Sequence, residues 1–191
     1  MKQPVVVDIE TKNSFQEVGS YDATMLDVSL VGLYDYATDA YESFLAEELD
    51  KLWPFLEKSS FIIGFNSIHF DIPILDKYYA GDLQAFPQLD ILKELKEVWG
   101  KGAKLDSIAH ATLGEGKSGD GLKAIELWKE GKIDELRDYC LDDVRITKDV
   151  YDFIKNERLL KIETVTGIQE VKLTIKDPEG VDQKRNFTLP L

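Results

Sequence analysis

Val5-Val6-Val7-Asp8-Ile9-Glu10, near the start of the chain, is the stretch that decides the expected fold. Three β-branched residues in succession favour a short buried strand, which we expect to run from Pro4 to Glu10. Side chains two residues apart in a strand point to the same face, so Asp8 and Glu10 should project together from its end. Carboxylates this close repel each other unless a positive charge lies between them. Alone, such a pair more often marks a solvated strand end than a cation site.

The rest of the chain predicts strands first and helices afterwards. Further strands are expected at residues 28–34, about 40–45 and 60–65. The leucines of residues 45–56 recur with helical spacing, although Pro54 should kink or split that helix. Residues 71–79 predict another helix, and residues 91–157 are mostly helical in pattern, broken by stretches that contain glycine. This order predicts an α/β fold in which helices flank a mixed central sheet.

A second acidic position, Asp71, follows an apolar stretch at residues 61–65. Its neighbours are Phe70, Ile72 and Pro73, and an aspartate among apolar residues is costly unless it is paired, caps a helix or binds a cation. Pro73 near the first turn makes the N-cap of the following helix the alternative role for Asp71. Capping and cation binding do not exclude each other.

The third acidic position lies on a helix expected over residues 136–154. An apolar stripe at steps of three and four residues should face the core, and it consists of Leu136, Cys140, Asp143, Thr147, Tyr151 and Ile154. Asp143 is therefore the buried candidate, whereas Asp142 lies off the stripe. Tyr139 precedes Asp143 by four residues and lies on nearly the same face. A tyrosine in such a position is ordinarily a core residue.

These elements converge on one chemistry. Hydrolysis of a phosphodiester is assisted by two metal ions about 4 Å apart, which activate the attacking water and stabilise the leaving oxygen. Hard cations need several oxygen ligands. Four carboxylates would supply them, those of Asp8, Glu10, Asp71 and Asp143, and the hydroxyl of Tyr139 can orient the attacking water.

The sequence resembles the DEDD 3'-5' exonucleases of the RNase H-like superfamily. Val5 to Thr11 is similar to their first motif, Asn66 to Asp71 to the second, and Tyr139 to Asp143 to the third. The Tyr-x-x-x-Asp spacing is that of the tyrosine subclass, which includes the proofreading domain of family B DNA polymerases. The histidine subclass would place a histidine where Asp138 stands. Segments around residues 104–109 and 122–125 are similar to predicted stand-alone, bacterial-type RNase H-like exonucleases.

The resemblance implies a role for each motif residue. Two divalent cations, Mg²⁺ or Mn²⁺, would be bound by Asp8, Glu10, Asp71 and Asp143. Tyr139 would orient the water, and Thr11 and Asn66 would contact the terminal nucleotide or its backbone. The substrate would be a 3' end of single-stranded DNA or RNA, between which the motifs do not choose. Because the thumb, palm and fingers of a polymerase do not fit into 191 residues, we expect no proofreading within this chain.

The residues after Leu160 predict a small β-hairpin. Residues 168–176 alternate, Asp177 to Gly180 have turn chemistry, and residues 184–189 are expected as the returning strand. An isolated hairpin is marginal in water, so it should pack on the main domain or on a protein partner. We expect an RNase H-like domain over residues 1–158 and a C-terminal β-hairpin extension over residues 159–191.

The composition limits the partners and the compartment. A formal charge of −13 argues against tight, non-specific binding of long duplexes, which depends on Lys and Arg contacts to phosphates. Bound divalent cations reverse the local sign at an acidic site, so the net charge does not exclude an end-bound substrate. The apolar stretches are too short to cross a membrane, and Asp8 and Glu10 interrupt any secretory segment. We therefore expect a cytoplasmic protein, with Cys140 as a small buried residue.

A non-catalytic module is the second hypothesis. Such a module would keep the RNase H-like fold and bind nucleic acid or a protein, with the C-terminal hairpin as its docking element. Clustered carboxylates raise one another's pKa and cost stability when no metal is bound. The complete set of four acidic residues therefore favours the enzyme.

Overall fold

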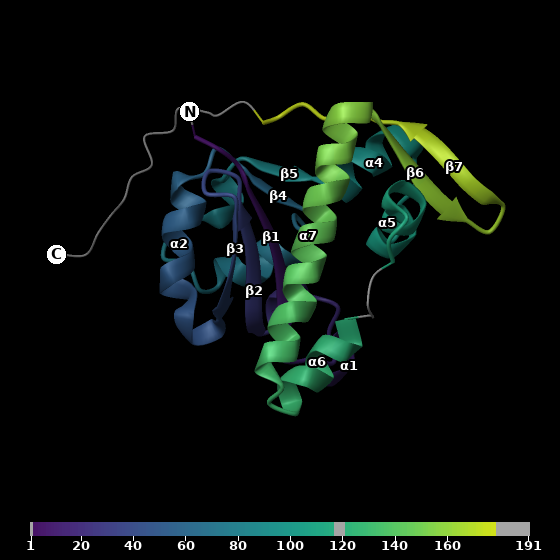
Figure 1. Cartoon of the computed structure of the whole chain (residues 1–191). Helices are drawn as coiled ribbons and strands as arrows, with labels where there is room; N and C mark the ends of the chain where they lie inside the picture. The colour runs from purple at the N-terminus through teal and green to yellow at the C-terminus, as the bar shows by residue number, and fades with distance from the viewer. Residues whose placement is uncertain (1, 117–120, 179–191) are drawn as a thin grey trace.

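The computed structural model describes residues 2–116 and 121–178, and its centre is a five-stranded sheet in the order β3-β2-β1-β4-β5 (Figure 1). The strands are β1 (Val5–Thr11), β2 (Val28–Asp35), β3 (Ala40–Leu45), β4 (Ile62–Gly64) and β5 (Gln88–Asp90). β2 is antiparallel to both of its neighbours, β1 and β3, whereas β4 is parallel to β1 and β5. The sheet is therefore mixed, as expected.

Helices cover both faces of this sheet. They are α1 (Phe15–Val18), α2 (Leu49–Lys58), α3 (Asp71–Asp76), α4 (Ile91–Trp99), α5 (Leu105–Leu113), α6 (Gly121–Lys129) and α7 (Ile133–Glu157). The long α7 crosses the face opposite to α2 (Figure 1). In the described parts of the chain, no helix combines the length and the apolarity that crossing a membrane requires. The arrangement confirms the expected α/β fold, in which helices flank a mixed central sheet.

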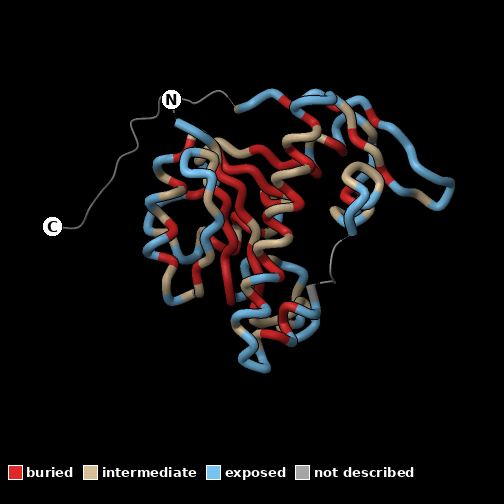
Figure 2. Tube along the Cα trace, viewed as in Figure 1, coloured by how far each residue is buried: buried red, intermediate tan, exposed pale blue. Residues whose placement is uncertain are grey.

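The valines of β1 show why this strand lies in the middle of the core. Val5 and Val7 belong to the apolar cluster that contains Leu52 of α2, whereas Val6 belongs to the cluster that contains Val144 of α7. Alternate side chains of one strand thus serve the two faces of the sheet. Figure 2 shows the result, with buried strands at the centre and exposed outer faces on the helices. Asp8 and Glu10 follow Val6 on the α7 face, beyond the apolar part of the strand.

Two local features differ from the sequence-based expectation. α2 runs through Pro54 without a break. Pro54 removes the hydrogen bond to the carbonyl of Asp50 and crowds that carbonyl, but both residues are exposed, so the carbonyl can tilt outward and be solvated by water. Leu52 and Leu56, both buried, anchor the helix on either side of the proline. The sequence also does not predict β5, because its three residues are too few to show an alternating pattern.

The C-terminal hairpin is present, but with a different pairing. It consists of β6 (Leu159–Thr164) and β7 (Gly167–Lys172), which are antiparallel. The predicted first strand at residues 168–176 is thus the second strand of the hairpin. The returning strand expected at residues 184–189 lies outside the described residues.

The end of α7 explains this pairing. Arg158 ends α7 in the left-handed conformation, with φ 58°, and directs the chain straight into β6. Leu160, Ile162 and Val171 are buried in the same apolar cluster as the inner face of α7. The hairpin therefore packs on the main domain, which is one of the two environments that the sequence predicts for it.

Candidate functional site

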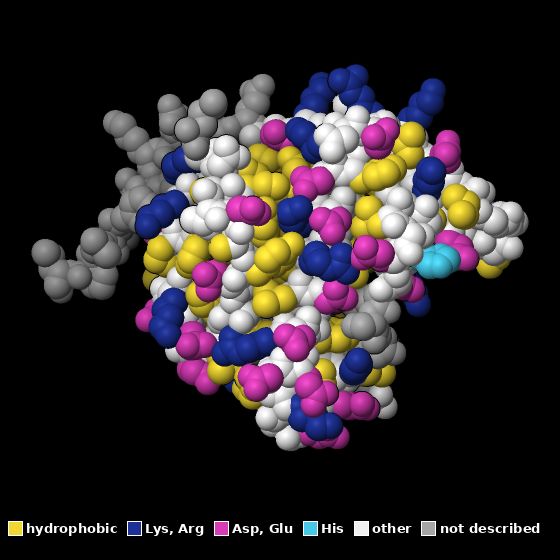
Figure 3. Space-filling model, in the orientation of Figure 1, with side chains coloured by type: hydrophobic (Ala, Val, Ile, Leu, Met, Phe, Trp, Pro, Cys, Tyr) yellow, Lys and Arg dark blue, Asp and Glu magenta, His cyan; other side chains and the backbone are white. Residues whose placement is uncertain are grey.

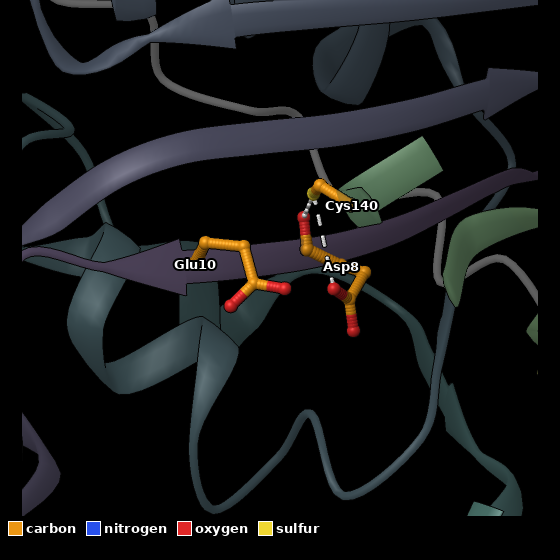
Figure 4. Close-up of side chains that lie close together, drawn as sticks. All are labelled: Asp8, Glu10 and Cys140. Atoms are coloured by element: carbon orange, nitrogen blue, oxygen red, sulfur yellow. Dashed lines mark hydrogen bonds between the residues drawn. The ribbon is translucent and has the colours of Figure 1, made fainter. Parts of the chain in front are cut away.

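β1 carries Asp8 and Glu10 side by side on the face that α7 covers. Glu10 is 7% exposed, and Asp8 is partly buried. One carboxylate oxygen of each residue and the Sγ atom of Cys140 lie within 4.8 Å of one another. Figure 4 shows the two carboxylates next to each other on β1, with Cys140 close to Asp8. The alternation of β1 thus brings the two carboxylates together, under a helix rather than at a solvated strand end.

α7 approaches the sheet closely at Gly32, which is the cross-strand neighbour of Asp8. A Cβ atom at Gly32 would lie 2.8 Å from Cγ2 of Val144 and 2.9 Å from Sγ of Cys140. These separations are shorter than van der Waals contact, so the missing side chain lets α7 rest directly on β2. Because Asp143 precedes Val144, this contact sets how close Asp143 lies to β1.

Asp71 approaches the same stretch of β1 from the start of α3. Its Oδ1 atom accepts a hydrogen bond at 3.1 Å from the backbone N–H of Ile9, the residue between Asp8 and Glu10. The N-cap of α3 is Phe70, so the side chain of Asp71 does not take the alternative capping role.

The environment of Asp71 disfavours a negative charge. Its side chain is 4% exposed, and this burial raises the pKa of the carboxyl to about 7, although backbone hydrogen bonds oppose the shift. The negative charge of Asp90 adds to the increase. A cation close to Asp71 would offset the cost of ionising it.

A cavity of about 360 Å³ joins the acidic residues. Four carboxylates from β1, α3 and α7 line it, those of Asp8, Glu10, Asp71 and Asp143. Asp143 is 3% exposed, as the helical stripe predicts. Among the described residues, Asp71 and Asp143 lie outside the tighter group that Asp8 and Glu10 form with Cys140. The structure therefore brings all four predicted carboxylates to one hollow and two of them into direct proximity.

Thr11 and Asn66 line the same cavity. The hydroxyl of Thr11 donates a hydrogen bond to the backbone oxygen of Asn13 at 2.8 Å. Asn66 has a φ of 62°, in the left-handed region that asparagine tolerates better than most residues. This conformation lets the chain leave β4 sharply and enter the loop that ends at Asp71.

Tyr139 lies one helical turn before Asp143 but is packed beside the cavity rather than in its wall. It is 4% exposed and belongs to the cluster that Leu30 and Ala124 form between β2 and α6. The Nζ atom of Lys123 lies 5.7 Å from the centroid of its ring. Within the described residues, the lining of the cavity does not include Tyr139.

Asp90 holds the loop that leads to Asp71, a role that the sequence does not reveal. It is 2% exposed at the end of β5, where it caps α4 by accepting hydrogen bonds from the N–H groups of Leu92 and Lys93. The same carboxylate accepts from the N–H of Asn66 at 2.8 Å and of Ile68 at 3.1 Å. Asp90 therefore fixes the loop between Asn66 and Asp71. Its aspartate-before-helix position indicates the cap, but nothing local indicates the distant loop.

The chemistry of the donors favours hard cations. Sγ of Cys140 lies 3.7 Å from the backbone oxygen of Asp8 and 3.9 Å from one of its carboxylate oxygens. Burial, and then the negative charges of Asp8, Glu10 and Asp143, raise the pKa of this thiol. The four carboxylates of the cavity supply hard oxygen donors, which suit Mg²⁺ or Mn²⁺, whereas a thiol suits softer cations.

The outer face of α7 carries charges of both signs. Figure 3 shows basic and acidic side chains interspersed over this helix. Lys148 pairs with Asp152 at 2.9 Å, and Arg145 pairs with Asp142 at 2.8 Å. Neighbouring opposite charges largely cancel at a distance, so this face has no strong attraction for phosphates.

Comparisons with known proteins agree with this geometry. The structure is similar to that of the family B DNA polymerase from the hyperthermophilic archaeon Pyrobaculum calidifontis, with a TM-score of 0.58 and 21% sequence identity. The similarity covers 81% of this chain and 24% of the polymerase, so this chain spans about a quarter of that protein's length. At such identity the likeness shows the fold alone. A search of curated proteins found no significant match.

The family match covers most of the chain. The sequence model described as the RNase_H superfamily matches residues 5–155, a range that begins with β1 and ends within α7. All four carboxylates of the cavity lie inside it. The chain therefore belongs to the RNase_H superfamily.

Proposed function

We propose that this chain is a metal-dependent 3'-5' exonuclease of the DEDD tyrosine subclass, which removes nucleotides from single-stranded DNA or RNA. The observation that carries the proposal is the cavity shared by the four carboxylates. Carboxylates buried together destabilise a fold unless cations neutralise them. The superfamily membership and the fold shared with a DNA polymerase support a nucleic acid as substrate.

The donor set fits two divalent cations, Mg²⁺ or Mn²⁺, held by Asp8, Glu10, Asp71 and Asp143. Cations bound there would activate a water molecule and stabilise the leaving oxygen of the phosphodiester. β1 and α7 supply rigid positions for three of the carboxylates, and the hydrogen bond from Ile9 fixes the fourth, that of Asp71. Rigid ligands keep the reacting phosphate in one geometry, which lowers the entropic part of the barrier.

Three further residues would position the reactants. Thr11 and Asn66 line the cavity and offer a hydroxyl and an amide, which can bind the sugar or the phosphate of the terminal nucleotide. Tyr139 would orient the attacking water. Because Tyr139 is buried and does not line the cavity, this role requires a side-chain adjustment when substrate binds. Catalytic hydrogen bonds often tighten only at that stage.

We also propose that residues 1–158 form the nuclease unit and that residues 159–191 are an extension that stabilises it. The burial of Leu160 and Ile162 against the main core supports the second part. Val165 and Ile168 are exposed near the tip of the hairpin. Contact with a protein partner, if the extension makes one, would involve this tip.

The test is degradation of 5'-labelled single-stranded DNA and RNA oligonucleotides in the presence of Mn²⁺. The proposal predicts a ladder of products shortened from the 3' end, which EDTA abolishes. Asp8→Ala and Asp143→Ala should each remove the activity, because each deletes a metal ligand. The preferred oligonucleotide would identify the natural substrate class.

Asp50→Ala is the matched control, because Asp50 is an exposed carboxylate on α2 and does not line the cavity. This variant should cleave like the original protein. Fragments produced by cuts inside the strand, without stepwise shortening from the 3' end, would contradict an exonuclease. Absence of cleavage of either strand would favour the non-catalytic module.

A further inference from the structure

A second hollow adjoins the acidic cavity. It has a volume of about 610 Å³, and we call it the Tyr21 groove after its most exposed aromatic residue. Ser14, Phe15 and Leu122 line both the groove and the acidic cavity. The two hollows are therefore adjacent, and a chain that reaches the cavity from this side would lie along the groove.

The groove presents apolar surface to solvent. Tyr21 is 94% exposed and Leu122 is 61% exposed. The ring centroids of Tyr21 and Phe15 lie 6.1 Å apart, and Phe15 lies 6.1 Å from Phe70, which lines the acidic cavity. Aromatic rings thus lead from solvent to the cavity. An exposed aromatic ring beside the cavity offers a face on which a base can stack.

Local contacts hold this wall in place. Ser14 and Glu17 form a capping box at the start of α1, and Gly19 ends that single turn with a φ of 67°. Glu17 also forms an ion pair with Lys129 of α6, so α1 and α6 lie side by side (Figure 1). A platform that is ordered before binding costs less entropy when a ligand arrives.

We propose that the Tyr21 groove binds the bases that precede the terminal nucleotide of a single-stranded substrate, with the ring of Tyr21 stacked on one of them. This proposal rests on the proposed nuclease function, because the acidic cavity would hold the terminal phosphodiester. Aromatic faces stack on every base, so such a groove accepts strands without regard to sequence.

The charge of the protein strengthens the case for stacking. With a net charge of −13, little affinity can come from general attraction to phosphates. Lys129, which reaches α1 from α6, is paired with Glu17, so the carboxylate offsets most of its attraction for a phosphate. Stacking on Tyr21 would therefore supply affinity that electrostatics does not. Paired bases are not available for such stacking, so the groove selects single strands.

The experiment is a fluorescence anisotropy titration of a labelled oligothymidylate of about eight nucleotides, within the usual range of single-strand sites. Ca²⁺ replaces the catalytic metal to neutralise the acidic cavity, and the oligonucleotide is checked for integrity after each titration. Tyr21→Ala should raise Kd about fivefold or more, the effect of losing one base–aromatic stack. Tyr21→Phe should remain within about twofold of the original Kd, whereas Tyr21→Leu should bind like Tyr21→Ala.

Tyr41→Ala is the matched control, because Tyr41 is an exposed tyrosine on β3 and does not line the groove. It should not change Kd. Three results would overturn the proposal that the groove binds bases. They are equal Kd values for the original protein and Tyr21→Ala, the same weakening in Tyr41→Ala as in Tyr21→Ala, and no binding by the original protein. A failure of the nuclease proposal looks different, since the original protein would then not cleave with Mn²⁺ although Tyr21→Ala still weakens binding.

Discussion

Replacement of Asp90 by asparagine tests how the cavity is built. One carboxylate oxygen accepts hydrogen bonds from the N–H groups of Asn66, Leu92 and Lys93 at 2.8, 2.9 and 3.2 Å, and the other accepts from Ile68 at 3.1 Å. A carboxamide has only one oxygen, so its NH₂ group would face at least one of these buried donors.

The magnitude follows from these bonds. A buried donor without an acceptor costs about 1–3 kcal/mol, and each remaining bond loses part of the strength that the negative charge gives it. Together these losses predict that Asp90→Asn lowers the free energy of unfolding by about 2–5 kcal/mol. In a chain of this length, that corresponds to a decrease in Tm of roughly 4–20 °C.

The assay is urea unfolding followed by tryptophan fluorescence, together with amide hydrogen exchange at Asn66 and Ile68. Both amides should exchange faster in Asp90→Asn. Asp82→Asn is the matched control, because Asp82 is exposed and accepts from the N–H groups of Gln84 and Ala85 at a helix start, where asparagine is an equally good cap. If the two variants lose similar stability, or if exchange at Asn66 is unchanged, Asp90 does not hold the loop as described.

Three other predictions concern the contact between α7 and β2, the carboxyl of Asp71 and the thiol of Cys140. Gly32→Ala should destabilise the fold by about 1–3 kcal/mol and lower kcat, because the new methyl group collides with α7 beside Asp143. Urea unfolding and cleavage assays measure the two effects. Gly116→Ala is the control and should change neither quantity, because its new methyl group would lie 3.8 Å from the nearest atom. Burial raises the pKa of Asp71 to about 7, so the folded protein holds this proton more tightly than the unfolded chain does. Without metal, this carboxyl therefore stabilises the fold fully below the unfolded-state pKa, and the stabilisation is lost as the pH rises through about 7. The increase in Tm caused by Mg²⁺ should therefore grow between about pH 6 and pH 8, because the cation displaces the proton of Asp71 more easily at higher pH. An increase that is constant over this range, or the same growth in Asp71→Asn, would show that cation and proton do not compete for this carboxyl. Cys140→Ala should lower the free energy of unfolding by about 1 kcal/mol, because it removes a buried side chain. The variant should retain the Mn²⁺-dependent increase in Tm, because a hard cation takes carboxylate oxygens rather than a thiol. Loss of that increase in a folded variant would make Cys140 part of the metal site.

The sequence predicts the features that depend on short-range periodicity. Alternation in β1 places Asp8 and Glu10 on one face, and the helical stripe of α7 places Asp143 inward, where the structure has it buried. Apolar neighbours of Asp71 indicate a buried carboxyl. Each of these inferences needs only the geometry of one strand or one helix.

Features that depend on contacts between distant segments are not predictable in this way. The second role of Asp90 depends on N–H groups 22 and 24 residues earlier in the chain. The hairpin pairing depends on where α7 ends, because residues 159–164 follow the helix directly and carry no turn signal before them. The packing of Tyr139 beside the cavity depends on α6, whose position relative to α7 no local pattern specifies.

A calorimetric titration with Mn²⁺ tests most directly the claim that the four carboxylates form a metal site. The original protein and Asp50→Ala should bind Mn²⁺ alike, with two ions per chain at saturation, whereas Asp8→Ala and Asp143→Ala should lose at least one of these ions. Unchanged Mn²⁺ binding in both cavity variants, or no binding by the original protein, would contradict the account.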